Sequence, residues 1–116
     1  MTDRINPIRI TDNESGETYE LGFSRDSVEF AENRGFVLED VAKFPATKVP
    51  ELWYYAFRMN HKGKSRTQTD ALLHRMGGLT VKALERLVLL YQQAQMSNNI
   101  QDEEDLEKNG AVTVEL

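Results

Sequence analysis

The sequence contains no cysteine, so it cannot form disulfide bonds or a zinc site with thiolate ligands. It has no apolar run of membrane-spanning length, and its first ten residues, MTDRINPIRI, lack the apolar core of a signal peptide. These absences predict a cytoplasmic protein with no membrane contact. Its 116 residues, 40% hydrophobic and 28% charged, are enough for one hydrophobic core and too few for two.

Residues that could support catalysis or metal binding are also scarce. The two histidines, His61 and His74, lack a metal-binding spacing, and the carboxylates form no metal-site pattern. Glycine occurs singly or as the pair Gly77 and Gly78, so there is no phosphate-binding loop. No serine lies in a nucleophile motif. We therefore expect no enzymatic activity, no cofactor and no metal.

Acidic residues are concentrated at the C-terminus. Residues 98–116 carry six acidic side chains and one basic side chain, and thus account for the whole net charge of −5. This composition predicts a flexible acidic tail, because the segment buries too little apolar surface to offset the entropy lost on ordering. A second interpretation concerns its end, since residues 111–116 (AVTVEL) alternate like a strand that adds to a sheet edge in a neighbour.

The start of the body has the pattern of a β-hairpin. Apolar and polar residues alternate in residues 5–10 and 19–23, on either side of the turn-rich sequence DNESGE. Pro7 favours an edge position for the first strand, where a missing N–H donor is tolerated. We predict a hairpin over about residues 5–23.

A helical period begins after the hairpin. Ser24 is a suitable N-cap for the first helix, and Gly35 is a suitable stop. Residues 36–44 hold about one further helical turn. The next helix covers about residues 46–60, with Pro50 in its first turn, where its missing N–H would be unpaired in any case.

Four aromatic residues lie within positions 53–57 of this helix. Tyr54 and Tyr55 flank its apolar stripe, and the spacing leaves open whether they pack in the core or face a partner. The stripe recurs at i, i+3, i+4, i+7 and i+8 and consists of Val49, Leu52, Trp53, Ala56 and Phe57.

Two more helices complete the body. Ser65 or Thr67 caps the first, which the Gly77 and Gly78 pair ends. Thr80 caps the last, VKALERLVLLYQQAQ, which is apolar enough to pack on two sides and therefore lies at the domain centre or at a subunit interface.

Together these patterns predict an α+β fold that is mostly α-helical, with about four helices and a small N-terminal β-hairpin. We expect a single globular domain over residues 1–97, made of the hairpin (5–23) and a helical body (24–97). The acidic tail of residues 98–116 follows it.

Nucleic acid is one partner to consider, because a cationic cluster runs from Arg58 to Arg75 beside two helices, 67–76 and 80–95, that could imitate a helix-turn-helix. However, the second helix is mainly aliphatic and has few side chains that could read base edges. The body is electrically neutral and the tail repels phosphate. We therefore expect no binding to nucleic acid.

The order of these elements resembles the tail assembly chaperones of long-tailed bacteriophages and prophages. The similarity covers roughly residues 17–95. It is carried by FAENRGF (30–36) after the hairpin, by PELWYYAFRMNH (50–61), and by MGGLT (76–80) followed by ALERLVLLYQQA (83–94).

This resemblance implies a non-enzymatic role in the cytoplasm of the bacterial host. Proteins of this family bind the long, helical, hydrophobic tape measure protein, keep it soluble and help tail tube subunits to polymerise around it. They are lost before the virion is complete, and many also exist in a longer, frameshifted form. The resemblance thus implies the tape measure protein as partner, with the tail tube protein as a further one.

A chaperone that coats an extended partner needs repeated weak contacts and self-association. By helical spacing, the core stripes do not need all of the apolar and tyrosine side chains on these helices, and Arg58 borders the cationic loop. The candidate partner-binding residues are therefore Tyr54, Tyr55, Arg58, Leu89, Leu90 and Tyr91.

Two other functions fit the same pattern. The chain could instead be a structural component of the tail or of the head-tail connector, which would remain in the virion. A DNA-binding regulator is the third alternative, and it predicts salt-dependent binding to duplex DNA.

Overall fold

The structure, a computed structural model, describes residues 5–96 and confirms the α+β, mostly helical fold. An antiparallel hairpin of β1 (Ile8–Thr11) and β2 (Thr18–Leu21) comes first. Five helices follow within the described residues: α1 (Arg25–Asn33), α2 (Asp40–Lys43), α3 (Pro45–Phe57), α4 (Arg66–Met76) and α5 (Val81–Met96). The tail predicted for residues 98–116 lies outside the described residues, so its flexibility stays a prediction.

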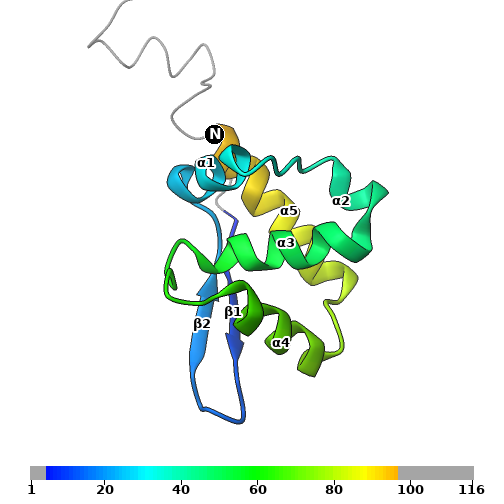
Figure 1. Cartoon of the computed structure of the whole chain (residues 1–116). Coiled ribbons are helices and arrows are strands. Elements are labelled where there is room, and N and C mark those ends of the chain that lie inside the picture. Colours follow the sequence, from blue (N-terminus) through cyan, green and yellow to red (C-terminus); the bar gives the residue numbers. More distant parts are fainter. Residues whose placement is uncertain (1–4, 97–116) are drawn as a thin grey trace, which may run out of the picture.

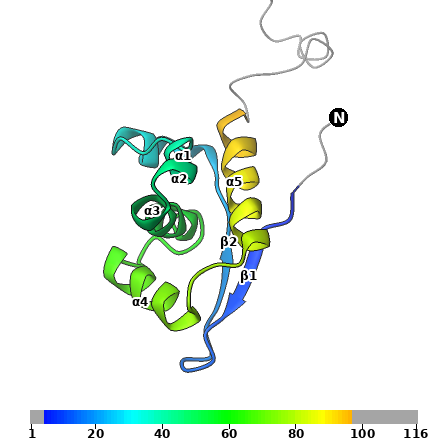
Figure 2. The same cartoon turned by 90° about the vertical axis from the view of Figure 1, so that its right-hand side faces the viewer.

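Helix α3 lies at the centre of the molecule (Figure 1). Helices α1, α2, α4 and α5 and strand β2 all contact it. In Figure 2, where α3 is viewed along its axis, α1, α3 and α4 form one stack, and α5 and the hairpin lie along its side. The central helix is therefore covered from several directions.

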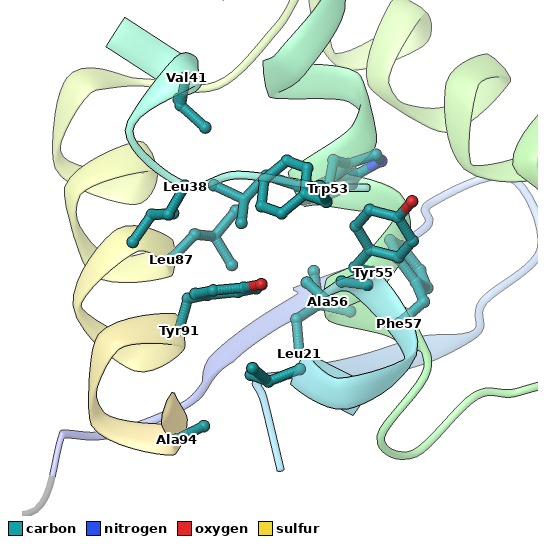
Figure 3. Close-up of a cluster of buried hydrophobic side chains, with 14 of the residues drawn as sticks. Leu21, Leu38, Val41, Trp53, Tyr55, Ala56, Phe57, Leu87, Tyr91 and Ala94 are labelled. Atoms are coloured by element: carbon teal, nitrogen blue, oxygen red, sulfur yellow. The ribbon is translucent and has the colours of Figure 1, made fainter. Parts of the chain in front are cut away.

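The hydrophobic core surrounds α3. Figure 3 shows Leu87 and Tyr91 of α5 pointing toward Trp53 and Ala56 of α3. The core stripe predicted on α3 is confirmed, except that Val49 is only partly buried. The buried cluster comprises Tyr19, Leu21, Val28, Ala31, Phe36, Leu38, Val41, Leu52, Trp53, Tyr55, Ala56, Phe57, Leu87, Tyr91 and Ala94.

Two predicted helix caps are present as hydrogen bonds. The hydroxyl oxygen of Ser24 accepts the backbone N–H of Ser27 at 3.2 Å, and the Ser27 hydroxyl oxygen accepts the N–H of Ser24 at 2.8 Å. At α5, the Thr80 hydroxyl oxygen accepts the N–H of Ala83 at 3.1 Å. Both caps satisfy N–H groups that have no partner within the helix.

Of the two caps considered for α4, the structure uses Ser65. Its hydroxyl oxygen accepts the N–H of Gln68 at 3.1 Å, and the Gln68 side-chain oxygen accepts the N–H of Ser65 at 2.9 Å. Gly77 ends α4 with φ +77°, a left-handed conformation that glycine adopts without strain.

The predicted position of Pro50 is wrong. Helix α3 begins at Pro45, so Pro50 lies inside the helix rather than in its first turn. Pro45 is tolerated because an N–H at the first position would have no helical partner. Pro50 leaves the carbonyl of Ala46 without an i+4 donor, and Ala46 is exposed, so water can hydrogen-bond to that carbonyl.

The outer edge of β2 is covered at Glu20 by residues that follow α3. The N–H of Glu20 donates to Nε2 of His61 at 3.1 Å, and the side-chain amide of Asn60 donates to the Glu20 carbonyl at 3.2 Å. The partner of Glu20 in the hairpin is Arg9, whose N–H and C=O point away from β2 and have no backbone partner within residues 5–96.

The hairpin tip is tied to α4 by Arg75. One guanidinium nitrogen donates to Oδ2 of Asp12 at 2.8 Å, and the other contacts both Asp12 and Glu14. The hydrogen bond from Arg75 is the largest cause that lowers the pKa of Asp12 from 3.8 to about 2. The hairpin is thus held against the helical body at its tip as well as along β2.

Tyr91 carries a polar group that the core does not satisfy. Its ring packs edge-on against Phe23 and Phe36, at centroid distances of 5.0 and 5.5 Å. Its hydroxyl is buried and has no hydrogen-bond partner among residues 5–96, and burial raises the pKa of the phenol. The ring is well packed, while the hydroxyl opposes folding.

We expect Tyr91→Phe to raise the free energy of unfolding by about 1 kcal/mol, because it removes an unsatisfied buried hydroxyl and keeps the ring. Urea denaturation followed by circular dichroism measures this change. Tyr54→Phe, at a partly buried position, is the control and should change stability less. A loss of stability in Tyr91→Phe would show that the hydroxyl has a partner.

We expect Arg75→Gln to lower the melting temperature at pH 7, with the deficit shrinking as the pH falls from about 4 to 2. A lowered pKa of Asp12 in the folded protein means that the ionised carboxylate stabilises the fold above its unfolded pKa, and that this contribution disappears on protonation. Thermal unfolding of both proteins across this pH range measures the difference. Arg86→Gln, an exposed arginine on α5, is the charge-matched control. A deficit that does not change with pH would contradict the assignment.

Candidate functional site

Three of the six candidate partner-binding residues lie in the core rather than on the surface. Tyr55, Leu90 and Tyr91 are buried, so the prediction that they supply surplus apolar surface is wrong. The rings of Phe30 and Phe36 pack edge-on against Tyr55 at 6.0 and 5.3 Å. Burial is also the main cause that raises the pKa of the Tyr55 phenol.

The remaining three candidates stay accessible in two different places. Leu89 lies on the exposed side of α5, whereas Tyr54 and Arg58 are partly buried at the end of α3. The six residues therefore do not form one continuous surface, and binding of a partner at the accessible three stays a prediction.

Helix α5 exposes large apolar side chains on the side opposite its core face. We call Val81, Leu89 and Met96 the α5 outer face, and their side chains are 72%, 49% and 48% exposed. They fall at i, i+8 and i+15, which places them within about one quarter of the helix circumference. The sequence predicted that α5 packs on two sides, at the domain centre or at a subunit interface. Within the described residues one side of α5 is packed and the side with Val81 and Leu89 is open to solvent, so packing at a subunit interface stays a prediction.

A second accessible feature lies where α1 and α3 end. The guanidinium carbons of Arg34 and Arg58 lie 4.3 and 3.6 Å from the centre of the Phe30 ring. We call Phe30, Arg34 and Arg58 the Arg34–Arg58 cluster. It combines two positive charges from different helix ends with one aromatic ring, a favourable cation–π arrangement.

Sequence reasoning missed two exposed apolar residues near α2. Val37 precedes this helix and Phe44 follows it, and the Phe44 side chain is 58% exposed. The signal was present in FVLEDVAKF, where apolar residues at 36, 37, 38, 41 and 44 exceed what one helical turn can bury on a single face.

The cationic cluster from Arg58 to Arg75 is not one continuous basic surface. Arg66 pairs with Asp70 at 2.9 Å, Arg75 pairs with Asp12 at 2.8 Å, and Lys64 lies 3.8 Å from Glu17. In addition, α4 packs on α3 and makes no close backbone contact with α5. The two helices therefore lack the mutual packing of a helix-turn-helix.

A cavity of about 190 Å³ lies between the hairpin and α4, bordered by Tyr19, Leu72 and Arg75. It is smaller than the roughly 300–1,000 Å³ of most small-molecule sites. Two more open depressions, of about 420 Å³ beside Glu14 and about 530 Å³ beside His74, fall within that range. Within residues 5–96, no three carboxylate or imidazole side chains are grouped as metal ligands, and no helix is both long and apolar enough to span a bilayer. These two depressions are open to solvent rather than enclosed.

Comparison with known proteins gives one match. Residues 1–116 match the family described as "Domain of unknown function (DUF5055)". No curated protein and no solved structure matches the chain significantly.

The neighbouring residues Leu89 and Leu90 test the assignment of the α5 outer face. We expect Leu90→Ala, at a 7% exposed side chain, to lower the free energy of unfolding by about 2–4 kcal/mol, and Leu89→Ala by less than about 1 kcal/mol. Both variants replace a leucine of α5 with alanine, so the change in helix propensity is the same in the two and does not affect their comparison. Urea denaturation measures both variants, and equal losses would mean that Leu89 also belongs to the core.

Proposed function

The chain belongs to the DUF5055 family, whose function is unknown, and we propose that it is a tail assembly chaperone of a long-tailed bacteriophage or prophage. In this role it binds the tape measure protein in the cytoplasm of the bacterial host, assists assembly of tail tube subunits around it, and is absent from the finished virion. The role requires no catalysis. The resemblance of residues 17–95 to this class of chaperone is the reason for naming it.

The observation that supports binding to a helical partner is the α5 outer face. Apolar side chains at helical spacing on an exposed face pack against the apolar stripe of another helix. The opposite side of α5 is buried through Leu87, Tyr91 and Ala94, so the outer face is presented by a firmly anchored helix. A preorganised surface of this kind loses little entropy on binding.

The composition of this face favours weak contacts. The polar residues Glu85 and Gln92 lie between the apolar side chains Val81, Leu89 and Met96. One copy would therefore gain only a few buried apolar side chains. Many copies along one extended partner, supported by self-association, would together bind far more strongly than one.

The test is co-expression of this chain with the tape measure protein, followed by size-exclusion chromatography with light scattering. We expect the tape measure protein to be insoluble alone and to elute with many copies of the wild-type chain. Leu89→Glu should weaken binding about tenfold or more, because burial of a leucine side chain is worth about 1.5–3 kcal/mol. Arg86→Gln changes the net charge by the same amount on the solvent side of α5 and should bind like the wild type.

Each alternative result has a distinct meaning. If Leu89→Glu binds like the wild type, the α5 outer face is not the docking surface. If the wild-type chain and a soluble tape measure protein elute separately, the chaperone proposal fails. Detection of the chain in purified virions would instead favour a structural tail or connector component.

A further inference from the structure

The Arg34–Arg58 cluster brings two like charges together without a carboxylate. Arg34 follows the last residue of α1 and Arg58 follows the last residue of α3, and both guanidinium groups lie over the Phe30 ring. Among residues 5–96, neither group has an ion pair or a side-chain hydrogen bond to a carboxylate. By contrast, Lys48, Arg66 and Arg75 each contact a carboxylate oxygen at close range.

Within residues 5–96, the N–H groups of both guanidinium groups have no hydrogen-bond acceptor. Stacking on an aromatic ring occupies the face of the guanidinium group. The N–H donors lie in the plane of the group and point outward, where they match the two oxygens of a carboxylate. A nearby anion would also offset the like charges of the two groups. The cluster therefore has the chemistry of a carboxylate-binding site.

The chain itself contains a segment of matching charge. Residues 102–107 have the sequence DEEDLE, with five carboxylates in six positions, whereas the rest of the chain up to residue 97 is neutral. This segment follows α5 in the chain, separated from Met96 by residues 97–101. Charge complementarity thus exists between the tail and this cluster.

The connection is long enough for the two to meet. The last turn of α5 lies beside α1 (Figure 1), where the side-chain amide of Gln95 donates to Oε1 of Glu32 at 3.4 Å. Arg34 is only two residues beyond Glu32. Residues 97–101 span roughly 17 Å when extended, and a helix with its side chains is about 10–12 Å wide. The acidic segment can therefore pass the end of α1 and reach the cluster.

We propose that the acidic segment 102–107 binds to Arg34 and Arg58 of the same chain through carboxylate–guanidinium hydrogen bonds. The covalent connection gives the segment a high effective concentration at the cluster, so individually weak ion pairs suffice. Another acidic protein would have to displace the tail in order to bind there. This inference does not depend on the proposed chaperone function.

The absence of cysteine allows a direct test with one spin label on the full chain. Asn109→Cys places a nitroxide just beyond the acidic segment without changing an acidic residue. We expect loss of the amide signals of residues 30–34 and 58 in nuclear magnetic resonance spectra of the ¹⁵N-labelled chain at low salt. The signals should return at about 1 M salt, where the screening length is about 3 Å.

Matched variants separate specific binding from general attraction. Arg34→Gln with Arg58→Gln should restore the signals, whereas Arg25→Gln with Arg86→Gln removes two exposed arginines elsewhere and should leave the loss unchanged. If the first pair disturbs folding, Glu104→Gln with Asp105→Asn tests the same contact without changing the core. The proposal is overturned if signal loss persists in either the Arg34 and Arg58 variant or the tail variant.

A mixing experiment distinguishes the same chain from a second copy. An ¹⁵N-labelled chain without the nitroxide is combined with an unlabelled chain that carries it. Absence of signal loss in the mixture supports binding within one chain. Signal loss in the mixture as strong as in the singly labelled chain would overturn the proposal in favour of contact between copies.

Discussion

The burial of α3 on several sides is the constraint on which the rest of the structure depends. A helix with Trp53, Tyr55 and Phe57 inside cannot be stable alone, because most of its circumference is apolar or aromatic. The remaining elements cover it, and the indole N–H of Trp53 donates to the buried carbonyl of Thr69 at 2.8 Å, which fixes α4 against it. The opening turns of α4 are therefore positioned by one hydrogen bond in addition to apolar contact.

The parts of the fold that the sequence predicted are those that depend on neighbouring residues. Helix caps and stops depend on residues that are close together in the sequence, so the sequence shows them directly. Examples are the caps Ser24 and Thr80 and the stop at Gly77. The burial of Tyr55 and Tyr91 depends on Phe36, which is distant in sequence from both. A helical wheel identifies the most apolar face and cannot show how many neighbours surround a helix.

The candidate site was only partly predictable for the same reason. Leu89 was identified correctly as accessible, while Leu90 beside it is buried. The Arg34–Arg58 cluster joins residues from two helix ends through Phe30, and no spacing rule connects them. Helix α5 links the two proposals, because it presents the outer face and because the acidic segment follows it in the chain after residues 97–101.

The partly closed edge of β2 has a consequence for symmetry. Because His61 and Asn60 occupy the backbone groups of Glu20, the edge of β1 is the more open of the two edges of the described hairpin. Two copies that paired through β1 would use the same edge on both sides, which is an isologous contact with a twofold axis. Such pairing would use the β1 edge of both molecules. The contacts at Glu20 then hinder a third strand from adding to β2, so they oppose growth of the described hairpin into an open-ended sheet.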